Sequence, residues 1–105
     1  MITLVIKLKV QDGKQAEFEK AASEQVERVL ANEPGTMLYT MVRSQTDSTE
    51  YFFLEAYKDD EAFAHHITEF QKIWGPQMNS MIARPNIVER TDPVSGFARI
   101  TTWQG

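Results

Sequence analysis

The chain has 105 residues, of which 42% are hydrophobic, 25% are charged and 10% are aromatic, and its formal net charge is -4. This length and composition are typical of a globular protein with one hydrophobic core, and not of a disordered or fibrous chain. The absence of cysteine excludes disulfides, thiolate metal sites and cysteine nucleophiles. The acidic balance and the dispersed basic residues predict that nucleic acid is not a partner.

The chain also lacks the patterns that direct a protein to a membrane. No apolar run reaches the ~18–20 residues that a membrane span needs, and no signal-peptide pattern follows Met1. We therefore expect a cytoplasmic protein without a membrane partner. We expect a single domain over residues 1–105, with its core in residues 1–92 and a C-terminal extension at residues 93–105.

The first two predicted elements are a strand and a helix. Apolar and polar side chains alternate over residues 2–10, which is typical of a strand with one buried face. Asp12 and Gln15 then have the spacing of a reciprocal helix cap. The following helix has apolar residues at intervals of three and four, namely Phe18, Ala21, Ala22, Val26, Val29 and Leu30. We expect it to end near Asn32, because residues 33–35 are Glu-Pro-Gly.

Two further strands are expected at residues 36–44 and 51–58, joined through a polar turn as a hairpin. The first has apolar side chains on both faces, with Met37 and Tyr39 on one face and Leu38 on the other. The second contains an apolar run of four residues. Strands that are apolar on both faces indicate a sheet that is covered on both sides.

A second helix is expected after the two aspartates at positions 59 and 60. Its apolar stripe consists of Phe63, His66, Ile67, Phe70 and Trp74. Gly-Pro at positions 75–76 is expected to interrupt this helix, and a short helix is expected at residues 77–83. A fourth strand is expected at residues 86–91, followed by a strand-like tail at residues 97–103.

The predicted order β-α-β-β-α-β is typical of a ferredoxin-like α+β fold, an antiparallel sheet with both helices on one face. The other face of such a sheet would expose apolar side chains to water. A second copy of the same sheet is the simplest symmetric cover. We therefore expect a homodimer in which the two sheets pack together.

Three segments of the sequence carry a family resemblance. They are Glu-Pro-Gly at residues 33–35 ahead of Tyr39, the aromatic strand at residues 51–57, and the acidic helix start at residues 60–66. Their order and spacing resemble those of the antibiotic-biosynthesis-monooxygenase (ABM) domain family, in which a histidine follows Ala-Phe after two residues. His66 falls on that histidine. The resemblance covers most of the chain and implies a dimeric α/β barrel.

The resemblance also implies an activity. Members of the family oxidise quinols, anthrones or related aromatic substrates with O₂ and without metal or flavin, while other members degrade haem. The haem-degrading relatives use an Asn in the first strand together with a Trp and a His. Residues 2–10 contain no Asn, so the haem interpretation lacks one of its three supports.

His66 is the candidate catalytic base, because histidine exchanges protons near neutral pH and this residue lies on the apolar stripe of its helix. A buried, hydrogen-bonded histidine without a chemical role is the alternative. His65 projects about 100° away around the helix, so the two rings are not placed to hold one metal ion. The candidate substrate-binding residues are Met37, Tyr39, Phe63, Ile67, Phe70 and Trp74, each of which is alternatively a core side chain.

The sequence contains no metalloprotease helix, phosphate loop or nucleotide-binding fingerprint, so we expect neither a metal ion nor a cofactor. The leading hypothesis is a cofactor-independent monooxygenase that oxidises a small quinol-like or polyketide-like aromatic with O₂. One alternative is a non-catalytic dimeric module of the same fold that binds an aromatic ligand. Another is a haem-binding or haem-degrading relative.

Overall fold

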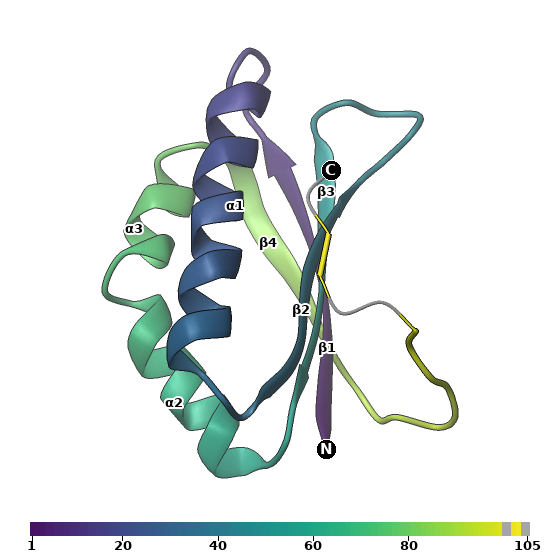
Figure 1. Ribbon diagram of the computed structural model, residues 1–105. Coiled ribbons are helices and arrows are strands. Elements are labelled where there is room, and N and C mark those ends of the chain that lie inside the picture. Colours follow the sequence, from purple (N-terminus) through teal and green to yellow (C-terminus); the bar gives the residue numbers. More distant parts are fainter. Residues whose placement is uncertain (100–101, 104–105) are drawn as a thin grey trace.

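The computed structural model describes residues 1–99 and 102–103 of the chain. The elements follow in the order β1 (Ile2–Val10), α1 (Gln15–Asn32), β2 (Thr36–Arg43), β3 (Glu50–Tyr57), α2 (Asp60–Phe70), α3 (Trp74–Asn79) and β4 (Ile82–Thr91). The strands form one antiparallel sheet in the order β2-β3-β1-β4, and α1, α2 and α3 lie on the same face of it (Figure 1). The predicted ferredoxin-like α+β fold is therefore confirmed. Within the described part of the chain, no helix has both the length and the apolar character that a membrane crossing requires.

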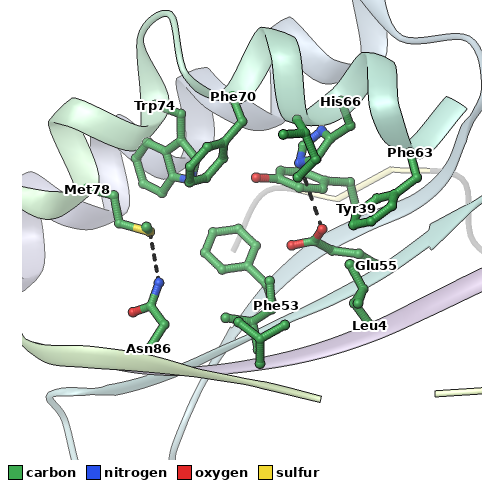
Figure 2. A pocket seen from close by; sticks show the side chains of 13 residues that line it. Leu4, Tyr39, Phe53, Glu55, Phe63, His66, Phe70, Trp74, Met78 and Asn86 are labelled. Carbon is green, nitrogen blue, oxygen red and sulfur yellow. Dashed lines mark hydrogen bonds and ion pairs between the residues drawn. The ribbon is translucent and has the colours of Figure 1, made fainter. Parts of the chain in front are cut away.

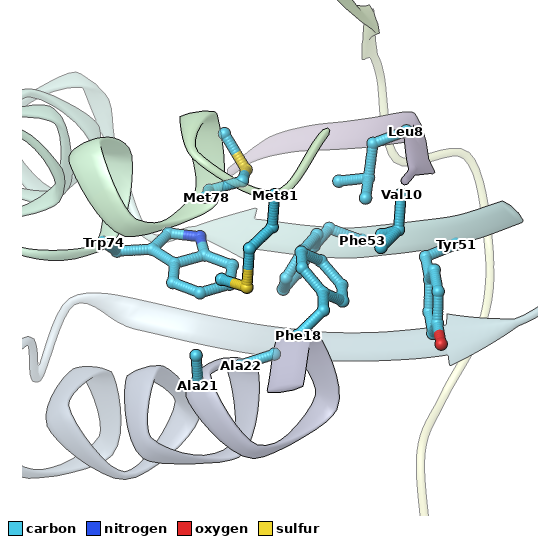
Figure 3. Packing of buried hydrophobic residues seen from close by; sticks show 10 residues of the cluster. All are labelled: Leu8, Val10, Phe18, Ala21, Ala22, Tyr51, Phe53, Trp74, Met78 and Met81. Carbon is cyan, nitrogen blue, oxygen red and sulfur yellow. The ribbon is translucent and has the colours of Figure 1, made fainter. Parts of the chain in front are cut away.

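The main core lies between the sheet and α1 and α3. Phe18 of α1 is at its centre, with its ring centroid 5.0 Å from that of Tyr51 and 5.6 Å from that of Trp74. The buried cluster consists of Leu8, Val10, Phe18, Ala21, Ala22, Tyr51, Phe53, Trp74, Met78 and Met81 (Figure 3). Strand alternation explains why β3 supplies Tyr51 and Phe53 to this cluster, since residues two apart point to the same face.

The opposite side of the sheet, called the outer face below, carries no helix among the described residues (Figure 1). Val5, Leu38 and Val42 on this face are 37–39% exposed, and Ile87 on β4 is 60% exposed. These residues belong to three different strands, so the apolar surface extends across the sheet. The prediction that the strands of the hairpin are apolar on both faces is thus confirmed.

The start of α1 differs from the predicted cap. The helix begins at Gln15 with Lys14 at its N-cap, and no side chain caps it. Gly13 has a φ of 93°, a left-handed conformation that favours glycine, and it turns the chain before the helix. Asp12 and Gln15 do interact, since Gln15 Nε2 donates to Asp12 Oδ1 at 3.0 Å, but their contact stabilises this turn instead of the first helical turn.

The buried face of α1 also differs in three residues from the predicted stripe, of which Val26 is only half-buried. Leu30 was expected on the buried face but is 69% exposed, whereas Gln25 is 4% exposed. The buried positions Phe18, Gln25 and Val29 are separated by seven and four residues, which keeps them on one side of a helix. Leu30 follows Val29 by one residue and therefore projects about 100° away from it.

The predicted interruption at Gly75 and Pro76 is wrong in position. α2 ends at Phe70, and α3 already begins at Trp74, so both residues lie in the first turn of α3. Proline is tolerated there because the first N–H groups of a helix have no intrahelical acceptor. A Cβ on Gly75 would lie 2.9 Å from Cε1 of Phe70, so glycine permits the close approach of the two helices.

The C-terminal part departs from the prediction at both ends. β4 begins at Ile82, which pairs with Val10, and not at residue 86. Pro85 fits within this strand because β4 is at the edge of the sheet and its register is irregular there. No strand is assigned to residues 97–99 or 102–103 of the predicted tail strand, and its residues 100–101 lie outside the described residues.

Gly35 provides a test of the packing between the start of β2 and α2. A Cβ built on Gly35 would lie 2.5 Å from Cβ of Ala62, in the first turn of α2. We predict that Gly35→Ala lowers the free energy of unfolding by about 1–3 kcal/mol, since the methyl groups cannot both be accommodated. The measurement is chemical denaturation. Adding Ala62→Gly removes the obstacle, so the double variant should be more stable than the sum of the single effects predicts.

Candidate functional site

A cavity of about 170 Å³ lies between the sheet and the helices α2 and α3 (Figure 2). Side chains from four strands and two helices surround it, namely Leu4, Ile6, Tyr39, Phe53, Glu55, Phe63, His66, Ile67, Phe70, Trp74, Met78, Asn86 and Val88. Most of these side chains are apolar or aromatic. Such a lining with a few polar groups is the usual composition of a small-molecule binding site.

His66 enters the cavity from α2. Phe63, His66 and Phe70 are spaced by three and four residues, so they share the face of the helix that is turned to the sheet. His66 is 3% exposed, and its Nδ1 lies 2.6 Å from Oε1 of Glu33. Glu33 is the C-cap residue of α1 and is itself 5% exposed. The hydroxyl of Thr36 donates a second hydrogen bond to the same carboxylate oxygen at 3.0 Å.

The other nitrogen of the His66 ring faces a second carboxylate. Nε2 of His66 lies 3.8 Å from Oε1 of Glu55, as the dashed line in Figure 2 marks, and Glu55 is 4% exposed. The hydroxyl of Tyr57 donates a short hydrogen bond to Glu55. Burial raises the pKa of Glu55 and outweighs the hydrogen bond from Tyr57 and the attraction of His66, which both lower this pKa.

This geometry defines what the histidine can do. An ionised carboxylate only accepts hydrogen bonds, so the contact with Glu33 holds the N–H group on Nδ1 of His66. Nε2 then carries the lone pair and can take up a proton on the side of Glu55 and the cavity. A carboxylate that orients a histidine and stabilises its protonated form is a recurring arrangement for general-base catalysis.

Tyr39 of β2 completes the polar end of the cavity. Its ring centroid lies 5.3 Å from that of His66 and 5.4 Å from that of Phe53. Burial, reinforced by the negative charge of Glu55, raises the pKa of Tyr39 well above its usual value. Tyr39 therefore stays protonated at neutral pH and offers a hydroxyl group as a hydrogen-bond donor.

The structure brings most of the predicted site residues together. Tyr39, Phe63, His66, Ile67, Phe70 and Trp74 all line the cavity. Met37 does not line it: this side chain is 61% exposed and lies in a separate groove with residues of α1. His65 is exposed and points away, with its Nε2 3.2 Å from the carbonyl oxygen of Asn32. The roles of the predicted site residues in binding or catalysis stay predictions.

Sequence reasoning missed the two acidic residues of the site and one amide. Glu55 had a recognisable signal, because Tyr51, Phe53 and Glu55 share one face of an apolar strand and a carboxylate on that face is unusual. Glu33 had no such signal, since Glu-Pro-Gly also fits an ordinary helix end. Asn86 lines the end of the cavity away from Glu55 (Figure 2), and its buried Oδ1 has no hydrogen-bond partner among the described residues.

The acidic residues and His66 do not form a metal centre. Glu33 and Glu55 contact different nitrogens of one imidazole ring, so the three side chains do not converge on a single point. Across residues 1–99 and 102–103, no group of three or more His, Asp or Glu side chains is placed to hold a metal ion.

The fold defines the chain as a ferredoxin-like α+β protein with a cavity between the sheet and the helices. The family model described as antibiotic biosynthesis monooxygenase matches residues 1–69. A solved structure from Caulobacter crescentus that carries this family's name is 39% identical, with a TM-score of 0.83 and 90% of each chain covered. The chain therefore belongs to the antibiotic biosynthesis monooxygenase family.

More distant structures share the fold. A protein from Nitrosomonas europaea with the same family name has a TM-score of 0.79 at 22% identity, covering 90% of this chain and 100% of its own. A conserved protein from Methanosarcina mazei has a TM-score of 0.78 at 23% identity, covering 86% and 89%. No functionally curated protein shows a significant match to the sequence.

The raised pKa of Glu55 predicts a specific pH dependence of stability. A carboxyl group whose pKa is higher in the folded state stabilises the fold while it is protonated, and this stabilisation is lost as the pH rises through the folded-state pKa. We predict that Glu55→Gln, which stays neutral, gains stability relative to the wild type as the pH rises from about 4 to 8. Urea unfolding across this range measures the difference, and a difference that is constant or shrinks would contradict the assignment.

Proposed function

We propose that the protein is a cofactor-independent monooxygenase that oxidises a small hydroxylated aromatic, such as a quinol, with O₂. The observation that carries this proposal is the contact of 2.6 Å between His66 Nδ1 and Glu33, with Nε2 turned towards Glu55 and the cavity. This arrangement supplies a base next to an apolar, aromatic-lined space. The family membership supports the class of reaction.

His66 takes the proton from a substrate hydroxyl, and Glu33 stabilises the protonated ring. The resulting phenolate is rich in electrons and reduces O₂ itself. For a hydroquinone, the products are a hydroxyquinone and water. One oxygen atom forms the new C–O bond, and the other leaves as water with the two hydroxyl protons. The substrate supplies all four electrons, two from the quinol and two from the C–H bond that is replaced.

The apolar lining has a role in the same reaction. Phe53, Phe70 and Trp74 keep water away from the reactive intermediates and contact the faces or edges of an aromatic ring. Tyr39 remains protonated, so its hydroxyl can donate a hydrogen bond to the oxygen on which negative charge develops.

His66 and His65 form a matched pair for testing the base. We predict that His66→Ala lowers quinol-dependent turnover by about 10²–10⁴-fold, the range for loss of a general acid or base, while His65→Ala leaves it unchanged. The measurement is O₂ uptake with a panel of quinols, normalised to folded protein, since removing His66 leaves Glu33 buried without its partner.

A second substitution separates catalysis from packing. His66→Asn keeps a donor near Glu33 and removes Nε2, so it should fold more stably than His66→Ala and still lose turnover. Equal activity of the His65 and His66 variants would remove histidine from the mechanism. Saturable binding of quinols without O₂ uptake would indicate a non-catalytic binding module, and a Soret shift upon addition of haem would indicate a haem-binding protein.

The proposed enzyme is a homodimer that forms through the outer face. Val5, Leu38, Val42 and Ile87 are exposed apolar side chains on this face in the single chain. Thr102 and Trp103 of the C-terminal extension line a groove along β2, together with Leu38, Val42 and residues of α1. An apolar surface of this kind on a sheet is stable when a second copy covers it.

Two measurements test the dimer. Light scattering at micromolar concentration should give twice the mass of the chain, because sheet-to-sheet packing removes the outer face from water. Deleting the residues after Pro93 should raise the dissociation constant of the dimer. The extension would supply apolar contacts through Phe97 and Trp103, which are 83% and 47% exposed in the single chain. A monomeric wild-type chain would refute the dimer, and an unchanged dissociation constant would refute the role of the extension.

A further inference from the structure

The charge of the cavity restricts what it can bind. No lysine or arginine belongs to the described residues that line it. Arg90 stacks on Phe63, with its guanidinium carbon 5.7 Å from the ring centroid, but it also contacts exposed Asp60 at 3.4 Å and lies largely in solvent. The cavity therefore offers no buried positive charge to an anionic ligand.

Two buried carboxyl groups add to this restriction. Glu55 lines the cavity, and Glu33 lies directly behind the His66 ring. A ligand that arrived as an anion would lose its hydration and approach these groups without a compensating cation, and both effects oppose binding. An uncharged ligand with a hydroxyl group meets neither cost, because it donates a hydrogen bond to the acceptors at this end.

The size of the cavity sets a second limit. A cavity of about 150 Å³ with an apolar lining holds one benzene molecule. The volume of about 170 Å³ thus accommodates one aromatic ring with small substituents. Fused rings would exceed this volume: the buried side chains of Trp74 and Met78 bound one side of the cavity, so a larger ligand would have to extend past the exposed lining residues Ile67 and Val88.

A polar group at the far end fits a ring with a second substituent. Asn86 lies at the opposite end of the cavity from Glu55 (Figure 2), and its Nδ2 contacts the sulfur of Met78 at 3.7 Å, a weak partner. The amide therefore has hydrogen-bonding capacity that the described residues do not fill.

We propose, building on the function above, that the substrate is an uncharged aromatic of a single ring with a hydroxyl group, and that anionic rings and fused polycyclic rings are excluded. The buried groups Glu55 and Glu33 and the lack of a cation in the described lining select against charge, while the volume of the cavity selects against size. Among the quinol-like or polyketide-like substrates predicted from the sequence, only the smallest, neutral compounds meet both limits.

Binding can be measured without oxidation, because Trp74 lines the cavity and its fluorescence reports occupancy. The substitution Trp103→Phe in the 105-residue chain removes the fluorescence of the other tryptophan. The charge test compares 4-hydroxybenzamide with 4-hydroxybenzoate, which have nearly the same shape and differ by one negative charge at pH 7. We expect the benzoate to bind more weakly by on the order of 100-fold, because its carboxylate loses its hydration at the Asn86 end of the cavity, where no described lining residue is a cation.

The size test compares phenol, 2-naphthol and a hydroxyanthracene. Phenol should bind, and affinity should fall with each added ring in the wild-type cavity. Phe70→Ala should enlarge the cavity and raise the affinity for 2-naphthol relative to phenol by about tenfold or more. Ile67→Ala, at a 41% exposed position of the lining, is the second enlarging variant if Phe70→Ala does not fold.

The outcomes separate this inference from the proposed function. Equal affinity for the benzoate and the benzamide, tight binding of the three-ring probe, or no binding of phenol and the benzamide would each overturn the inference. Selective binding of neutral single rings without O₂ uptake from quinols would uphold it and refute the monooxygenase. O₂ uptake with carboxylated or polycyclic quinols would support the monooxygenase and refute the inference.

Discussion

The carboxylate of Glu33 is buried at the end of α1, and its contact with His66 is the interaction on which the site depends. A negative charge at the C-terminus of a helix is unfavourable, because the helix dipole is negative there. Glu33 also loses its hydration upon burial. The hydrogen bonds from His66 and Thr36 compensate for both costs. The contact joins α1 to α2 and holds the imidazole with Nε2 towards Glu55 on β3, so three elements must be in place before the His66 ring has this orientation.

The same alternation of β3 serves both packing and chemistry. Tyr51 and Phe53 fill the core against α1 and α3, and Glu55, two residues further, reaches the cavity from the same face of the strand. The neighbouring positions point to the outer face, where they contribute to an apolar surface without a helix. One strand thus supplies residues to the core, to the candidate site and to the proposed dimer interface. A shift of its pairing register by one residue would turn the core and site residues to the outer face and the outer-face residues to the core.

The sequence was sufficient for the fold and for the helix face that carries His66, because both follow from local periodicity. Residues that act through distant contacts were not predictable in this way. Glu33 and His66 are 33 residues apart, and only the docking of α2 beside the end of α1 brings them together. The position of the break between α2 and α3 depends on a local steric contact. Because Gly75 has no side chain, Phe70 can approach α3 closely, and the Gly-Pro pair predicted to interrupt a helix lies inside one.

The proposed formation of a phenolate by His66 and the proposed exclusion of anionic ligands are compatible in terms of charge. When a neutral substrate gives its proton to His66, the phenolate forms beside an imidazolium, and the total charge of the site does not change. An anion from solution would add one negative charge to a site that already contains Glu33 and has no buried cation in its described lining. Burial raises the pKa of Glu55, so this carboxyl group resists ionisation more strongly in the folded protein than in water. A neutral substrate that ionises inside the proposed site would therefore avoid the cost that an anion entering from solution would meet.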